Sequence, residues 1–297
     1  MTATALPLTA PRTRRLSLAR IRAGRLGVSG WLCATWVSLV GLGALLAPWL
    51  PLDDPRATDF SVLQNNAPPG TGGHLLGTDQ NGFDILSRLV WGGRVSLVVA
   101  FGVLAIGMTV GGTVGLIAGY ARGKTETFLM GAVDIFLAFP ALILLIAVVA
   151  FLGPGLPNVV FGISLVSVPA FARIARATTL TFASRDFVLA ARASGATRVR
   201  ILAREVLPNV VLPLLAFGLL VVAIAIVAEG SLAFLGLTSQ ETISWGGMIN
   251  GGRQALQQKD IVHTSLIPAT AMFLTVLSIN LLGDRFRAGF DVKETAL

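Results

Sequence analysis

Apolar residues along this chain gather in six long runs, and polar segments of unequal length separate the runs. A helix needs about 20 mostly apolar residues to cross the hydrocarbon core of a bilayer, and each run approaches that length. The pattern therefore predicts an all-α, polytopic membrane protein with six transmembrane helices. The predicted spans lie near Val28–Leu50, Val95–Tyr120, Phe128–Leu152, Val159–Leu180, Val210–Leu235 and Ser265–Leu282.

The first apolar run follows a basic leader, as in a secretory signal peptide. The run is too long for a signal-peptide core, and no small-residue cleavage motif follows it, so we expect a retained anchor. The next polar segment is long and rich in turn residues. The predicted divisions are a basic cytoplasmic N-terminal segment (1–27), a first transmembrane helix (28–50), an extracytoplasmic loop (51–93), a core with spans two to six (94–284) and a cytoplasmic tail (285–297).

Composition agrees with a membrane location and suggests an orientation. Hydrophobic residues make up 54% of the 297 residues and charged residues only 13%, whereas soluble domains carry about 25% charged residues. Most of the 23 Lys and Arg residues fall in alternate segments. By the positive-inside rule, both termini are expected in the cytoplasm, with the chain crossing the cytoplasmic membrane. Anionic lipid headgroups suffice to explain the net charge of +8, so no nucleic-acid partner is predicted.

Enzyme chemistry on this chain is not predicted. Residues Ala118–Thr125 read AGYARGKT, a loose match to a phosphate-binding loop, but a membrane span rather than a soluble strand precedes them. Cys33 is the single cysteine and the two histidines are far apart in the sequence, so no metal site is predicted. No nucleophile–base constellation is present either. If ATP drives this protein, ATP and Mg²⁺ must bind to separate chains.

Four glycines in the second apolar run recur at every fourth position. Residues at this spacing share one helix face, and glycine there lets another backbone approach closely. We therefore predict a helix-packing face made of Gly107, Gly111, Gly115 and Gly119.

A charged segment between the fourth and fifth runs predicts two short cytoplasmic helices that meet at a corner. Residues Asp186–Ser194 favour a helix, Gly195 can end it, and Thr197 can cap a second helix over Arg198–Val206. Pro208 is expected to start or kink the next span. Phe187, Ala190 and Ala191 would form a small apolar ridge. The ridge fits a partner's groove, while an amphipathic helix lying on headgroups remains the alternative.

This segment resembles the signature of bacterial ABC-importer permeases, E-A-A-x-x-x-G-x9-I-x-L-P. The sequence has LAARASG, nine residues and EVLP, with Leu189 in place of the signature's Glu and Glu205 in place of its Ile. The matching residues are Ala190, Ala191, Gly195, Leu207 and Pro208.

Two further segments resemble the C-type permease of dipeptide, oligopeptide and nickel importers, and the likeness covers roughly residues 28 to 290. One is HLLGTDQNGFDILSRLVWGGRVSL at His74–Leu97, and the other is AEGSLAFLGL at Ala228–Leu237 followed by SWGGMINGGR. The first could suggest a metal site, but Thr and Asp side chains commonly bond turn amides, so a capped turn is preferred. The extracytoplasmic motif comprises His74, Gly77, Thr78, Asp79, Gly82, Asp84 and Trp245.

The resemblance implies a type I ABC-importer permease fold and a translocation role. It implies a heterodimer with a second homologous permease, two cytoplasmic ATPase subunits or a fused ATPase, and an extracytoplasmic binding protein. Peptides are the expected cargo, with nickel or haem-type cargo as alternatives. The residues expected to couple to the ATPases are Asp186, Phe187, Ala190, Ala191, Gly195, Leu207 and Pro208.

Two carboxylates fall inside predicted spans, where a charge usually faces a cavity or a partner. For Asp134 we favour pairing with Arg173, Arg176 or a helix end. For Glu229 a position on the pore side toward the outside competes with a hydrogen bond between helices. Both acids and Ser231 are candidates for the translocation pathway. A proton-coupled secondary transporter using the two acids is the rival class, although such transporters often show paired repeats, which are not evident here.

Overall fold

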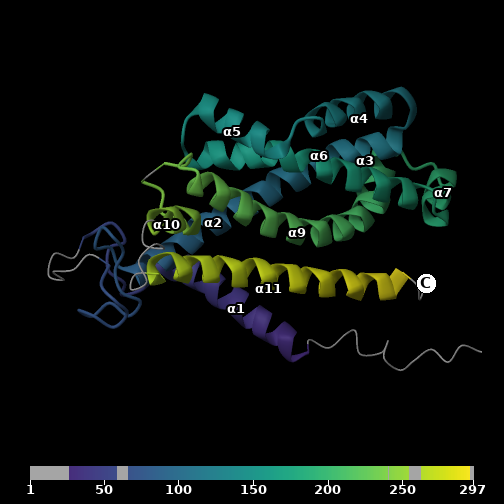
Figure 1. Ribbon diagram of the computed structural model, residues 1–297. Coiled ribbons are helices and arrows are strands. Elements are labelled where there is room, and N and C mark those ends of the chain that lie inside the picture. The colour runs from purple at the N-terminus through teal and green to yellow at the C-terminus, as the bar shows by residue number, and fades with distance from the viewer. Residues whose placement is uncertain (1–26, 59–65, 240, 254–261, 295–297) are drawn as a thin grey trace, which may run out of the picture.

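The computed structural model describes residues 27–58, 66–239, 241–253 and 262–294, with side chains up to residue 288. Within these ranges the regular secondary structure is helical (Figure 1). This confirms the predicted all-α membrane architecture. The basic leader and the last three residues lie outside the described residues, so the predicted N-terminal segment is not tested.

Five helical stretches are long and apolar enough to cross a membrane. α1 (Val28–Leu46) continues into the short η2 (Ala47–Trp49). The second stretch joins α2 (Ile85–Ile106), the π-helical η3 (Gly107–Gly111) and α3 (Gly112–Ala121), and the others are α6 (Leu156–Ala183), α9 (Leu207–Phe234) with the turns before it, and α11 (His263–Glu294).

The predicted third span, Phe128–Leu152, is not one straight helix. The structure divides it into α4 (Gly123–Leu137) and α5 (Ala141–Leu152), whose axes differ by 84°. Pro140 lies at the break. Proline lacks an amide donor, and its ring disfavours helical angles at the residue before it. The described ranges thus hold five continuous candidate spans, or six if the bent pair counts as one.

Two boundaries also differ from the prediction. α2 begins at Ile85 rather than near Val95, so the first turns of the second span lie within the predicted outer loop. The predicted second short helix is continuous with the fifth span: α8 (Arg198–Ile201), the π-helical η4 (Leu202–Val206) and α9 follow without a gap. Pro208 therefore causes no break, and the π-helical η4 ends two residues before it; local π-helical adjustments satisfy the backbone groups that proline leaves unpaired.

α6 and α9 form the centre of the bundle. α3 packs along α6, and α9 contacts α2, α6 and α11. Figure 1 shows α1 beside α11 on one flank, with α4 and α5 over α6 on the other. Phe171 and Ile226 are fully buried in this core. The short α7 (Asp186–Ala193) lies at one end of the bundle, and α10 (Trp245–Gly251) lies toward the opposite end.

The glycine ladder packs within this chain, against α6. A Cβ on Gly107 would lie 2.6 Å from the Phe171 ring, and one on Gly119 would lie 2.8 Å from the backbone oxygen of Arg176. Gly111 and Gly115 approach the α6 backbone even more closely. The spacing therefore marks a contact between two helices of one subunit, which glycine makes possible because it has no side chain.

Candidate functional site

The segment between α6 and α9 forms the helix–glycine–helix corner that the sequence indicates. Gly195 follows α7 with φ +78°, and its amide donates to the Arg192 carbonyl at 3.0 Å. The amide of Ala196 donates to the Ala191 carbonyl at 3.1 Å. Nothing lies within 4 Å of a Cβ built on Gly195. Glycine is therefore favoured at this position because the backbone is left-handed, and not because a side chain would lack space.

The second arm of the corner starts at a side-chain cap. The N-cap of α8 is Thr197, and the helix begins at Arg198. The amide of Arg200 donates to the Thr197 hydroxyl at 3.4 Å. Val188 on α7 and Ile201 on α8 are buried. The two arms are thus anchored by apolar side chains on their inner faces, which makes the corner a fixed part of the bundle.

The outer face of the same corner is apolar and exposed. Phe187 is 40% exposed and Leu189 51% exposed, while Ala190 is exposed and Ala191 half-buried. Apolar groups gathered on a polar surface mark interaction sites. Asp186, Leu207 and Pro208 are also exposed, but the last two belong to the start of α9 and not to the α7 ridge.

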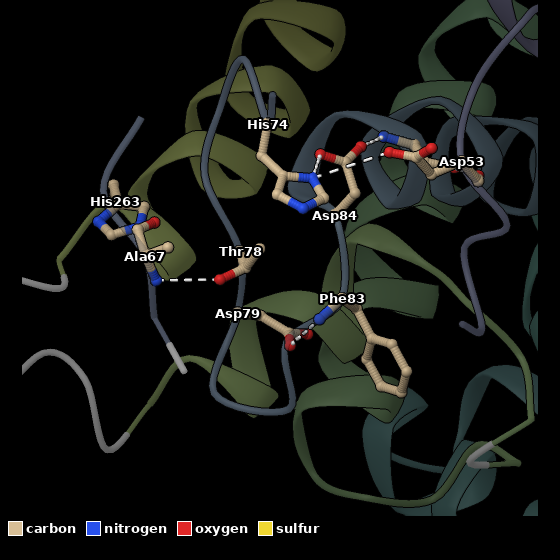
Figure 2. Close-up of polar contacts among 9 residues, drawn as sticks. Asp53, Ala67, His74, Thr78, Asp79, Phe83, Asp84 and His263 are labelled. Carbon is tan, nitrogen blue, oxygen red and sulfur yellow. Dashed lines mark hydrogen bonds and ion pairs between the residues drawn. The ribbon is translucent and has the colours of Figure 1, made fainter. Parts of the chain in front are cut away.

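The sequence motif His74–Asp84 is a turn that caps α2 (Figure 2). Asp84 accepts from the amide of Ser87 at 2.6 Å and lies 2.9 Å from Nδ1 of His74. Asp79 accepts from two loop amides, and the hydroxyl of Thr78 accepts from the amide of Ala67 at 2.9 Å. Gly77 and Gly82 have φ +80° and +77°. The geometry matches a capped turn.

Asp53 is a member of this cluster that sequence reasoning missed. Its carboxylate lies 3.8 Å from Nδ1 of His74, and Figure 2 shows both beside Asp84. Ligand atoms of Asp53, His74 and Asp84 lie within 4.8 Å of one another. The Asp84 carboxylate already accepts from the Ser87 amide as the N-cap of α2. Asp53 comes from the segment after α1, so only the folded chain brings it to His74.

Trp245 locks α10 against the start of α2. Its ring is buried and its Nε1 donates to the carbonyl of Leu89 at 2.8 Å. A Cβ on Gly93 would lie 2.9 Å from the Trp245 ring. The tryptophan thus fills a notch that two glycines, Gly92 and Gly93, leave on α2.

Glu229 is buried inside the subunit, where it makes the bond between helices that the sequence offered as the alternative to a pore-side position. Only 1% of the residue is exposed. The Ser96 hydroxyl on α2 donates to its carboxylate at 2.9 Å, and the Ser244 hydroxyl before α10 also bonds it. No ion pair with Glu229 is found in the described part of the chain. Its carboxylate therefore joins α9, α2 and the α10 cap. Ser231 is half-buried and bonds the Val227 carbonyl of its own helix.

Unlike Glu229, which is buried in the core, Asp134 lies on the exposed side of α4. Its carboxylate is 58% exposed and bonds Arg173 at 2.7 Å, the pairing that the sequence favoured. Sequence reasoning missed a parallel pair, in which the Nε of Arg176 donates to Glu126 at 2.6 Å. Both pairs join α4 to α6. Glu126 escaped notice because it precedes the apolar part of the predicted third span.

Comparison with known proteins defines the class. Residues 111–293 match the family described as binding-protein-dependent transport system inner membrane component. The glutathione transport system permease protein GsiD of Pectobacterium atrosepticum is 39% identical over 82% of this chain and 80% of that protein. The di/tripeptide transport system permease protein DppC of Pseudomonas aeruginosa is 39% identical over 86% of this chain and 85% of its own length.

A solved structure agrees on the fold. A chain of the MetNI methionine ABC transporter in an inward-facing conformation superposes with a TM-score of 0.58 and 22% identity, covering 69% of this chain and 97% of that chain. The protein is therefore a multi-pass membrane permease with the fold of an ABC importer. It belongs to the family of binding-protein-dependent transport system inner membrane components, whose members are translocation subunits rather than enzymes.

Proposed function

We propose that this chain is one of two permease subunits in an ATP-driven importer of short peptides. The observation that carries the coupling role is the exposed apolar ridge on α7, held by Gly195 at φ +78°. The names of the relatives, which transport glutathione or di- and tripeptides, support peptide cargo. The second subunit would be a homologous permease.

The coupling would work as a lever. Two ATPase subunits, or one fused ATPase, bind ATP and Mg²⁺ and press on the α7 ridge. Because Val188 and Ile201 anchor the corner, and α8 runs directly into α9, a push on the ridge is transmitted to a whole span. Packed helices move as rigid units rather than deform. The chain then converts ATPase closure into outward opening.

The orientation follows from the same corner. Arg192, Arg198 and Arg200 lie on or beside α7 and α8, and Arg122 lies on the turn between α3 and α4. Basic residues in short loops favour the cytoplasmic side. This supports cytoplasmic termini and an extracytoplasmic location for the His74–Asp84 turn and α10, where a substrate-binding protein would deliver cargo.

Uptake and co-purification test this proposal together. Cells that carry the gene should accumulate a labelled dipeptide, and cells without it should not. Mild-detergent extracts should yield this chain with two ATPase chains and a second permease. Uptake of nickel or haem instead of peptide would show that the assigned cargo is wrong. A chain that purifies alone and transports in response to a proton gradient would contradict the importer class.

A further inference from the structure

A cavity of about 520 Å³ lies where the segment after α1, the start of α2 and the loop before α10 meet. Its volume is in the range of small-molecule sites. The lining combines charges of both signs with an aromatic ring and aliphatic side chains. The residues used below are Asp54, Trp91, Arg94, Val95, Val98 and Glu241.

α2 supplies the inner wall of the cavity. Trp91, Arg94, Val95 and Val98 are spaced by three and four residues, so they share one helix face. The guanidinium of Arg94 lies over the Trp91 ring at 5.4 Å from its centroid. This stacking limits the motion of the long side chain and fixes the direction of its planar fork.

Arg94 differs from Arg88, which lies earlier on α2, in having no anionic partner. Arg88 pairs with Asp79 at 2.7 Å, and Arg56 donates to the Glu241 backbone carbonyl at 3.2 Å. No carboxylate pairs with Arg94 in the ranges that the structure describes. An ionisable side chain within a span, half-buried and without a counter-charge, indicates a functional site.

The rim of the cavity carries two carboxylates. Asp54 and Glu241 are both exposed on loops. Arg56 connects these loops, because its amide donates to Asp54 and its guanidinium donates to the Glu241 backbone. Arg56 bonds the backbone oxygen of Glu241, so this bond does not use the side-chain carboxylate of Glu241. The cavity therefore places Arg94 on its wall, and its exposed rim holds the two carboxylates together with the guanidinium of Arg56.

We propose that this cavity is a cargo subsite of the permease, in which Arg94 binds the C-terminal carboxylate of a short peptide. Arginine matches a carboxylate with two parallel hydrogen bonds. The rim carboxylates attract the peptide's amino terminus, and Val95 and Val98 contact its apolar side chains. This inference rests on the proposed function, and it assigns part of the cargo selection to the permease itself.

The test compares maximal uptake of a labelled dipeptide with that of its C-terminal amide in cells that express the complete transporter. Saturating cargo removes differences in affinity at the delivery step. The wild type should favour the free acid by about tenfold or more, as expected for a charge-assisted pair. Arg94→Gln should bring the ratio of acid uptake to amide uptake close to one. Arg94→Lys should retain part of the preference for the acid.

Arg253→Gln is the matched control. Arg253 also stacks on an aromatic ring, Phe234, at 5.8 Å, but it does not line the cavity. Its substitution should leave the acid-to-amide ratio unchanged. An Arg94→Gln transporter that keeps the wild-type ratio, or loses acid and amide equally, overturns the inference. A wild type that takes up no peptide at all contradicts the proposed function instead.

A rim variant keeps the test decisive if Arg94→Gln fails to assemble. Glu241→Gln changes an exposed loop side chain whose backbone contact with Arg56 remains. It should reduce the preference for a free dipeptide over its N-acetyl derivative. An unchanged preference for the free amino terminus would rule out the predicted orientation of the peptide.

Discussion

Glu229 shows how much a single residue's role depends on its surroundings. The sequence places an acid two-thirds of the way along a predicted span, which fits either a pore lining or a bond between helices. In the structure it is buried and hydroxyl groups from two other elements bond it. Hydrogen bonding rather than an ion pair compensates the burial. The residue therefore acts as a structural tie in this conformation.

Glu229→Gln should preserve this tie, because an amide oxygen still accepts from Ser96. We expect nearly unchanged assembly and transport. Glu229→Leu should leave both serine hydroxyls without their acceptor, which costs about 1–3 kcal/mol for each buried group. Thermal unfolding of the complex in detergent measures the difference. Loss of transport in the Gln variant, with normal assembly, would restore a role for the charge.

Gly195 has a conformational requirement rather than a spatial one. Gly195→Val should strain the corner by about 1–3 kcal/mol, because valine disfavours left-handed angles. We expect normal membrane insertion but weaker ATPase association and slower transport. Gly195→Asn is the control, since asparagine tolerates these angles. Co-purified ATPase and uptake rate are the measurements. Equal behaviour of the Val and Asn variants would argue against the coupling role.

At the scale of elements, α3 and α6 form the tightest contact, and glycines set its distance. Helix association in lipid depends on close packing, because lipid tails are as apolar as the side chains. The sequence predicted a packing face from spacing alone. It could not show that the partner is a helix of the same chain, since α3 ends at Ala121 and α6 begins only at Leu156.

Gly115→Leu should force α3 away from the Ala172 carbonyl and the Ala175 side chain. Overpacking of this kind typically costs about 1–3 kcal/mol or more. We expect a lower unfolding temperature in detergent. Gly131→Leu on α4 is the matched control, because nothing lies within 4 Å of its Cβ position. If both variants unfold like the wild type, the α3–α6 contact is looser than the structure indicates.

At the scale of the whole molecule, apolar runs were enough to predict the all-α architecture and the approximate places of the five continuous candidate spans. The helix corner was predictable because its signals are local: a glycine, a capping threonine and an exposed ridge. The break at Pro140 was missed because the apolar run continues through it. The start of α2 was missed because Arg88 and Arg94 interrupt the run. The partners of Glu229 and Asp53 depend on tertiary contacts that no local pattern encodes.

The whole-molecule arrangement predicts opposite sides of the membrane for two exposed positions. Asn81 lies in the turn before α2, and Lys124 lies at the start of α4. Cys33 is the single native cysteine, so a Cys33→Ser background permits selective labelling. A membrane-impermeant maleimide should label Asn81→Cys in intact cells with a permeable outer envelope.

Lys124→Cys should react only after the cytoplasmic membrane is opened. The reason is the positive-inside bias, which places the arginines of α7 and α8 and the turn at Lys124 on one side. The two variants control for each other, because each should label when both sides are accessible. Labelling of Lys124→Cys but not Asn81→Cys in intact cells would invert the orientation. The α7 ridge would then face away from any cytoplasmic ATPase, so the lever mechanism would fail with it.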